Sequence, residues 1–269
     1  MEKFSPSRLK TYETCPRKYR FIYIDNLGPQ FEKPRPELYL GNQIHAALRH
    51  FFETAPQERT LDLLHHLFRR AWASDGKRRE TFADAAAEIP YGKRGLALLE
   101  QFFNQQDTRV IPYKLEEWVE CPVDEKNALL GKIDRVDREP DGSLHLIDYK
   151  TGKAPSSLAY VQHDLQLPVY WLMAEATFGQ PVSRISYLYL DRPQPITLQF
   201  GQAEIEAVRE RVRKLIQAIE SDQQFLPVSN PLCRYCDFQS ICPLESRVSP
   251  QAAAAQDAEI EQAVQDLPF

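Results

Sequence analysis

The sequence predicts a mixed α/β fold in which a central mixed sheet is flanked by helices. Apolar residues recur at helical spacing within residues 38–103, 165–178 and 205–219. Alternating or apolar segments typical of strands occupy residues 113–150 and 185–200. The elements therefore follow the order helices, three strands, helix, two strands, helix, which suits a sheet covered by helices and preceded by a helical lobe.

Length and composition set the limits of this prediction. The chain has 269 residues, of which 43% are hydrophobic, so it can bury a proper core as one large domain or two small ones. Aromatic residues at 11% and charged residues at 26% argue against disorder. The start of the chain does not resemble a signal peptide, and no apolar run approaches the roughly 18 residues of a membrane span. We therefore expect a cytoplasmic protein with no membrane partner.

Charge is unevenly distributed along the chain. The net charge of -5 disfavours a nucleic-acid partner when it is taken alone. Residues 1–35 carry eight Lys or Arg against four Asp or Glu, whereas the tail from Ser249 carries four acidic residues and no basic one. Two interpretations of the basic segment stay open, a local groove for phosphates and an ordinary solvated face.

The sequence predicts helices in the N-terminal half of the chain. Ser5 and Pro6 have the residue types of an N-cap and a first helical position, and Cys15 ends this helix ahead of Pro16. A second helix is expected over residues 38–52, and His45 lies within it. An isolated histidine in this setting is either a partly buried residue bonded to backbone or a ligand, and spacing alone does not decide between them.

The sheet is expected to begin near Tyr113 and to contain a hairpin. One strand covers residues 132–136, the sequence Pro140-Asp141-Gly142 supplies the turn, and residues 144–150 form the return strand. In this geometry Asp134 and Asp148 can converge, and Asp148 shares a face with Lys150 because the two are two positions apart.

Two carboxylates and a lysine on one face are costly to bury unless something binds between them. A hard divalent cation such as Mg²⁺ takes oxygen ligands and would relieve the repulsion. Lys150 would then stabilise charge on a phosphate or help to deprotonate the attacking water. The alternative is a solvated hairpin rim with one weak salt bridge.

Four motifs in order resemble the PD-(D/E)xK nuclease superfamily, in particular its RecB-like branch. They are Gly131-x-x-Asp134, the run Asp148-Tyr149-Lys150-Thr151-Gly152, Gly41-x-x-x-His45 upstream and Gln166-x-x-x-Tyr170 downstream. The resemblance implies a restriction-endonuclease-like fold and a metal-dependent DNA nuclease. No GxxxxGK[ST] motif occurs in the sequence, so any helicase would be a separate partner.

The resemblance also implies roles for individual residues. Asp134, Asp148 and Lys150 would be catalytic, and Mg²⁺ or Mn²⁺ would be held by His45, Asp134, Asp148 and the carbonyl of Tyr149. Gln166 and Tyr170 would face the site, where they would contact DNA or order the lysine. Members of this branch often carry a glutamate on the first strand, for which Glu116 is the closest match by position and Glu117 the next.

A second cluster is Cys233-x2-Cys236-x5-Cys242 near the C-terminus. Thiolates at these spacings can surround a zinc ion or an iron-sulfur cluster, and packing is the third interpretation. With Cys15 as a distant first ligand, the pattern resembles the AddB nuclease domain and the small exonucleases of CRISPR adaptation modules. The resemblance implies a 4Fe-4S cluster, with zinc as the alternative. Cys121 has no matching flanks and is expected in the core.

We therefore expect four segments: a helical lobe over residues 1–107, a nuclease core over 108–225, an iron-sulfur segment over 226–248 and an acidic tail over 249–269. The function expected is that of a RecB-like exonuclease acting on single-stranded DNA or DNA ends in DNA repair. One alternative is a CRISPR-adaptation nuclease that trims DNA before integration within a larger complex. Another is a non-catalytic DNA-binding scaffold.

Overall fold

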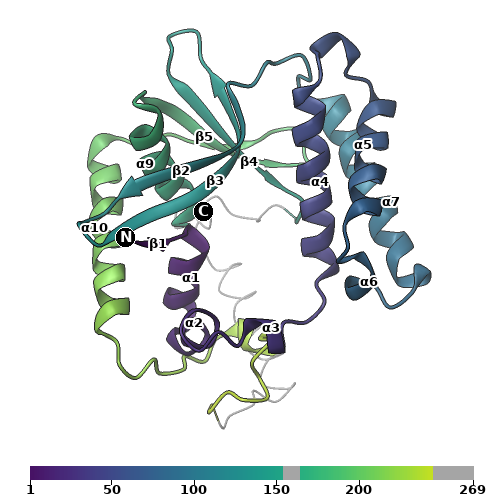
Figure 1. Cartoon of the computed structure of the whole chain (residues 1–269). Helices are drawn as coiled ribbons and strands as arrows, with labels where there is room; N and C mark the ends of the chain where they lie inside the picture. The colour runs from purple at the N-terminus through teal and green to yellow at the C-terminus, as the bar shows by residue number, and fades with distance from the viewer. Residues whose placement is uncertain (154–163, 245–269) are drawn as a thin grey trace, which may run out of the picture. The chain divides into compact units, whose positions relative to one another are not determined.

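The computed structural model describes residues 1–153 and 164–244 (Figure 1). The chain divides into two compact units, residues 1–7 with 34–214 and residues 8–33 with 215–269. The boundaries fall inside α1 (Pro6–Thr14) and α10 (Gln202–Ser221). The four segments expected from the sequence stay a prediction, and the acidic tail from Ser249 lies outside the described residues.

The first unit is built on a six-stranded mixed sheet, as predicted. Its main path runs β1-β3-β4-β5-β6, and β2 pairs with β3 off this path. β1 pairs with β3 and β4 with β5 in parallel, whereas the other pairs are antiparallel. The strands are β1 (Glu2–Phe4), β2 (Lys114–Pro122), β3 (Asn127–Arg138), β4 (Leu144–Lys150), β5 (Val182–Tyr189) and β6 (Ile196–Leu198).

The predicted hairpin is confirmed as β3 and β4. Their pairing starts at Arg138 and Leu144 and runs to Arg135 and Ile147. Gly142 in the turn has a φ of +87°, a conformation that glycine adopts without steric cost. The Pro-Asp-Gly signal thus sets the register that carries Asp148 toward the end of β4.

Three long helices bury one core with the sheet. α4 (Pro36–Glu53), α5 (Leu61–Ser74) and α7 (Ala85–Gln105) lie side by side in Figure 1. Their apolar faces pack with side chains of β4 and β5, among them Ile147, Tyr149 and Leu188. Short elements connect these helices, namely η1 (Pro56–Glu58) and α6 (Arg78–Thr81), whereas α3 (Gly28–Phe31) precedes α4 and belongs to the second unit.

α7 is longer than its amphipathic pattern over residues 94–103 indicates. It begins at Ala85, where the carboxylate of Asp84 accepts a hydrogen bond from the Ala87 N–H at 2.8 Å and caps the helix. α9 (Gln166–Phe178) matches its prediction and packs against β2, β3 and β5. Pro168 falls in its first turn, where proline costs no internal hydrogen bond.

The second unit joins the two ends of the sequence. It contains most of α1, α2 (Pro16–Tyr23), the end of α10 and η2 (Pro231–Tyr235). Its aromatic core includes Tyr19 stacked on Phe225, with ring centroids 6.2 Å apart, and Phe21 against Phe238 at 5.2 Å. Among the described helices, none has both the length and the apolar character needed to cross a membrane.

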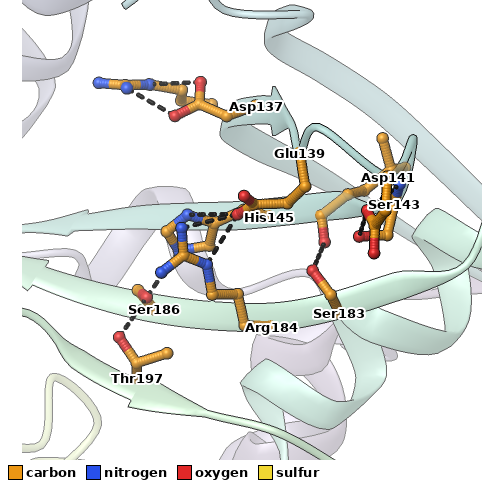
Figure 2. Close-up of polar contacts among 11 residues, drawn as sticks. Asp137, Glu139, Asp141, Ser143, His145, Ser183, Arg184, Ser186 and Thr197 are labelled. Atoms are coloured by element: carbon orange, nitrogen blue, oxygen red, sulfur yellow. Dashed lines mark hydrogen bonds and ion pairs between the residues drawn. The ribbon is translucent and has the colours of Figure 1, made fainter.

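A buried polar network crosses the end of β4 opposite to Lys150 (Figure 2). His145 Nε2 lies 2.8 Å from the hydroxyl of Ser186, which lies 2.8 Å from that of Thr197. Beside them, Arg184 Nε donates a hydrogen bond to Glu139 at 2.8 Å. Burial, reinforced by the nearby Arg184 charge, lowers the pKa of His145 to about 4. His145 is therefore neutral in the folded protein at physiological pH.

This neutral histidine should make the fold sensitive to mild acid. Between the ordinary pKa of 6.5 and about 4, the unfolded chain takes up a proton at His145 that the folded chain does not. The free energy of unfolding should therefore decrease as the pH is lowered across this window, and His145 should contribute up to about 3 kcal/mol to the decrease. Urea unfolding at pH 7 and pH 5 measures the change.

The variant His145→Gln should show a smaller loss of unfolding free energy between these two pH values than the wild type. His66→Gln, at an exposed position of α5, is the matched control and should keep the wild-type dependence. Equal pH dependence in wild type and His145→Gln would contradict the assignment.

Candidate functional site

Three adjacent strands bring three acidic residues together. The pairings on either side place Glu116 of β2 opposite Asp134 of β3. The last β3–β4 pair is Arg135 with Ile147, which leaves Asp134 and Asp148 next in register. Glu116, Asp134 and Asp148 therefore occupy neighbouring positions across β2, β3 and β4, where their charges repel unless a cation or protons balance them.

His45 of α4 completes this acidic group. Its Nδ1 lies 3.2 Å from Asp134 Oδ1 and 3.9 Å from Glu116 Oε1, and its Nε2 lies 3.2 Å from the carbonyl oxygen of Tyr149. His45, Glu116 and Asp134 each offer a ligand atom within 4.8 Å of the others, and within residues 1–153 and 164–244 no other such group of three is found. Carboxylate and carbonyl oxygens with one imidazole suit Mg²⁺ or Mn²⁺.

Two glycines of the sequence motifs allow this close packing. A Cβ on Gly41 would lie 3.4 Å from Thr151 Oγ1, an ordinary van der Waals contact, so alanine would fit there whereas larger side chains would have to extend past the end of β4. A Cβ on Gly131 would lie 2.7 Å from Tyr170 Cε1, which is closer than real contacts allow. Gly41 lets the helix of His45 reach the strand, and Gly131 leaves room for Tyr170 of α9.

Glu116 holds an unusual backbone conformation. Its φ is +50° although it lies inside β2 and is not a glycine. Such a conformation costs on the order of 1–3 kcal/mol and tends to occur at functional sites. Glu116 also forms an ion pair with Lys132. The structure thus brings Glu116 to the acidic group, while Glu117, the second match by position, lies 3.8 Å from Lys114.

Lys150 and Asp148 are linked through Gln166. Lys150 Nζ lies 2.7 Å from Asp148 Oδ2, and Gln166 Nε2 donates a hydrogen bond to Asp148 Oδ1 at 2.8 Å. Gln166 Oε1 in turn accepts hydrogen bonds from Lys150 Nζ at 3.4 Å and from the hydroxyl of Tyr187 at 3.2 Å. A single amide therefore orients both the carboxylate and the ammonium group.

Sequence reasoning did not identify two supports of this arrangement. Asp164 accepts a hydrogen bond from the Gln166 N–H at 2.9 Å, and its Oδ2 lies 3.3 Å from the Tyr187 hydroxyl, whose single proton Asp164 shares with Gln166 Oε1. The Lys150 ammonium also lies 4.5 Å from the centre of the Tyr187 ring, a cation–π distance. Tyr187 sits in the apolar strand Val182–Tyr189, whose periodicity indicated only packing.

The electrostatics of the site reflect the crowded acids. Burial raises the pKa of Asp148 to about 6, which the Lys150 charge opposes and the Asp134 charge reinforces. Burial would lower the pKa of His45, but its hydrogen bond to Asp134 and the surrounding carboxylates raise it above the ordinary value. Burial and the charges of Asp148 and Asp134 likewise raise the pKa of Tyr170. Asp148 and His45 therefore bind a proton more readily than their isolated side chains do.

Four of the five cysteines lie in the second unit. Cys15 stands at the N-cap position of α2, and Asn230 caps η2. The Asn230 side-chain amide donates a hydrogen bond to the carbonyl of Thr14 at 3.2 Å, and its backbone N–H donates to Cys233 Sγ at 3.4 Å. The residue before Cys15 is thereby tied to the turn that carries Cys233.

All five cysteines have free thiols, since none of them forms a disulfide. Burial raises the pKa of Cys236, and the Cys15 thiol is near enough to contribute in the same direction. Cys121 is buried in β2 of the first unit, which confirms its expected place in the core.

Comparison with known proteins identifies relatives of two kinds. The "Gene 69 protein" of Mycobacterium phage D29 is 27% identical over 270 residues, which cover 89% of this chain and 96% of that protein. An ATP-dependent helicase/deoxyribonuclease subunit of Carboxydothermus hydrogenoformans is 29% identical over 250 residues, which cover 78% of this chain. The match spans only 22% of the length of that helicase/deoxyribonuclease polypeptide.

The fold has a counterpart among solved structures. A candidate exonuclease from Eubacterium rectale superposes with a TM-score of 0.58 at 13% identity, over 92% of this chain and 91% of that one. A family model described as the PD-(D/E)XK nuclease superfamily matches residues 3–243, which contain every residue of the acidic group and all the cysteines. Because this match extends over most of the sequence, the chain belongs to the PD-(D/E)XK nuclease superfamily.

Proposed function

We propose that the protein is a metal-dependent deoxyribonuclease that acts as an exonuclease on single-stranded DNA or DNA ends. The observation that carries the proposal is the convergence of Asp134, Asp148 and Lys150 beside His45. This set joins carboxylates for a cation to an ammonium group for phosphate chemistry. A non-catalytic scaffold would not require Lys150 to be held by both Asp148 and Gln166.

The residues present fit a divalent cation. His45, Asp134, Asp148 and the carbonyl of Tyr149 would hold it, and Glu116 adds a carboxylate on the β2 side. When bound, such an ion supplies Lewis-acid polarisation of the phosphate and a nucleophile from water at neutral pH. Electrostatics support this view, because the carboxylates around His45 raise its pKa against the effect of burial, and burial together with the Asp134 charge raises the pKa of Asp148.

The chain's own groups would divide the remaining work. Lys150 presents a cation where charge develops on the phosphate oxygens, or assists removal of a proton from the attacking water. Gln166 keeps Lys150 and Asp148 in a fixed relation, so we assign it as a positioning residue. Tyr170, packed over Gly131, would line the same site and contact the DNA.

The pathway is proposed from the relationship to a helicase/deoxyribonuclease, which favours DNA repair or recombination with a separate helicase as partner. A nuclease that trims DNA for CRISPR adaptation would use the same catalytic residues. The two pathways therefore differ in partners and not in chemistry.

We further propose that Cys15, Cys233, Cys236 and Cys242 hold a 4Fe-4S cluster. Backbone N–H groups bonded to sulfur, as at Cys233, stabilise the thiolates that bind metal. Around one zinc ion, tetrahedral thiolates at about 2.3 Å would lie roughly 4 Å apart. The cluster would join the N-terminal and C-terminal segments of the second unit.

Replacing Lys150 with alanine should nearly abolish cleavage. Removal of the ammonium group should lower the rate of hydrolysis of an end-labelled single-stranded oligonucleotide in Mg²⁺ or Mn²⁺ by roughly 10²–10⁴-fold. Lys126→Ala, which removes an exposed lysine from the turn before β3, is the control and should cleave at the wild-type rate. A wild-type protein inactive with both metals would instead support the scaffold alternative.

Replacing Asp134 with asparagine should weaken cation binding directly. Titration of Mn²⁺ followed by electron paramagnetic resonance should show an affinity lower by at least about tenfold, because even residues that only orient metal ligands contribute roughly 10–100-fold. Asp62→Asn, on the exposed side of α5, should bind like the wild type. Unchanged Mn²⁺ affinity in Asp134→Asn would show that the cation binds elsewhere.

Anaerobically purified protein should be brown and contain iron and sulfide in equal amounts. Cys236→Ser should lose the visible absorption, because one thiolate ligand is removed, whereas Cys121→Ser should retain it. Colourless protein with one zinc ion per chain would contradict the iron-sulfur proposal and support the zinc alternative.

A further inference from the structure

Trp118 is an exposed aromatic side chain on the strand that carries Glu116. It is 62% exposed, whereas the other two tryptophans, Trp72 and Trp171, are 8% and 4% exposed. β2 pairs only with β3 among the described strands, so Trp118 lies on an edge strand of the sheet. Tryptophan is enriched at interfaces because its large ring contributes much contact area while its N–H can still find a hydrogen-bond partner.

The position of Trp118 relates it to the acidic group. Trp118 pairs directly with Lys132 across β2 and β3, so their Cβ atoms are about 5 Å apart. Lys132 forms an ion pair with Glu116, and Glu116 is two residues from Trp118, at most about 7 Å between Cα atoms. The ring and the ammonium group thus form one surface beside the candidate metal ligands.

The charge of Lys132 selects among possible occupants of this surface. Lys132 is 42% exposed and its present partner, Glu116, is one of the three residues suited to hold a cation. When Glu116 turns to a cation, Lys132 becomes available to a second anion. A flat aromatic face next to an ammonium group matches a nucleobase next to its phosphate, and neutral apolar partners would leave the ammonium unsatisfied.

We propose that Trp118 stacks on an unpaired base of the substrate while Lys132 contacts the adjoining phosphate. The inference rests on the proposed nuclease function and deepens it by naming the substrate class as single-stranded DNA. Bases inside a duplex are already stacked on both faces, so they cannot offer a face to Trp118 without being unstacked. The strand that reaches the acidic group is therefore single-stranded on the β2 side.

Binding of a fluorescein-labelled oligothymidylate, measured by anisotropy on the full chain, tests the proposal. The Lys150→Ala background with Mg²⁺ keeps the oligonucleotide intact. Adding Trp118→Ala should weaken binding by about 5- to 100-fold, as for other stacked bases. Trp118→Phe should restore most of the affinity, and Ile89→Ala, an exposed apolar residue of α7, should change nothing. Affinity for a long duplex without a loop should depend far less on Trp118, because only its terminal base pairs expose a face.

A spectroscopic signature accompanies this test. Because Trp118 is the exposed tryptophan, oligothymidylate should quench tryptophan fluorescence, and the quenching should be absent in Trp118→Phe. Unchanged affinity in Trp118→Ala, or an equal loss for the long duplex and the single strand, would overturn the proposal.

Cleavage assays separate this inference from the proposed function. In protein that keeps Lys150, the substitution Trp118→Ala should raise KM for single strands with little change in kcat. A wild type that binds and quenches but does not cleave would refute the nuclease function and leave the stacking intact. If the wild type cleaves and Trp118→Ala has the same KM, the stacking alone would be refuted.

Discussion

The candidate site of the first unit rests on one constraint, which is that the sheet holds three partly buried carboxylates close together although their charges repel. β-Sheet register fixes Glu116, Asp134 and Asp148 at neighbouring positions, and α4 adds His45. Because each carboxylate belongs to a paired strand, the backbone keeps the three side chains at neighbouring positions. The raised pKa values of Asp148 and His45 are the expected response to that constraint. A divalent cation resolves the same repulsion more fully than protons do.

Other residues of the first unit position the side chains of this acidic group and of Lys150. Gly41 allows the helix of His45 to approach, Gly131 leaves space for Tyr170, and the amide of Gln166 couples Asp148 to Lys150. Gly131 and Gln166 thus have a packing or hydrogen-bonding reason that is visible in the contacts. The family membership of the chain agrees with this arrangement, and the activity proposed for it follows from the residues themselves.

Sequence periodicity predicted those helices and strands whose ends are marked by turn or capping residues. The strand Leu144–Lys150 follows a Pro-Asp-Gly turn, and α9 begins where Pro168 is tolerated, so both matched closely. β1 was missed because three residues paired with β3 have no periodicity of their own. Glu116 was indicated only by position, since a left-handed residue inside a strand leaves no mark in the alternation pattern. The supporting roles of Asp164 and Tyr187 arise from contacts between distant segments, which no local pattern encodes.

The left-handed backbone of Glu116 also has an evolutionary consequence. Glycine adopts that conformation without the steric cost of a Cβ atom, so a glycine at this position would relax the strand while it removed the carboxylate. Selection for a more stable strand would then favour glycine at position 116, whereas selection for the carboxylate would favour glutamate. Lineages that had lost the need for the acidic group would be free to settle on the relaxed form.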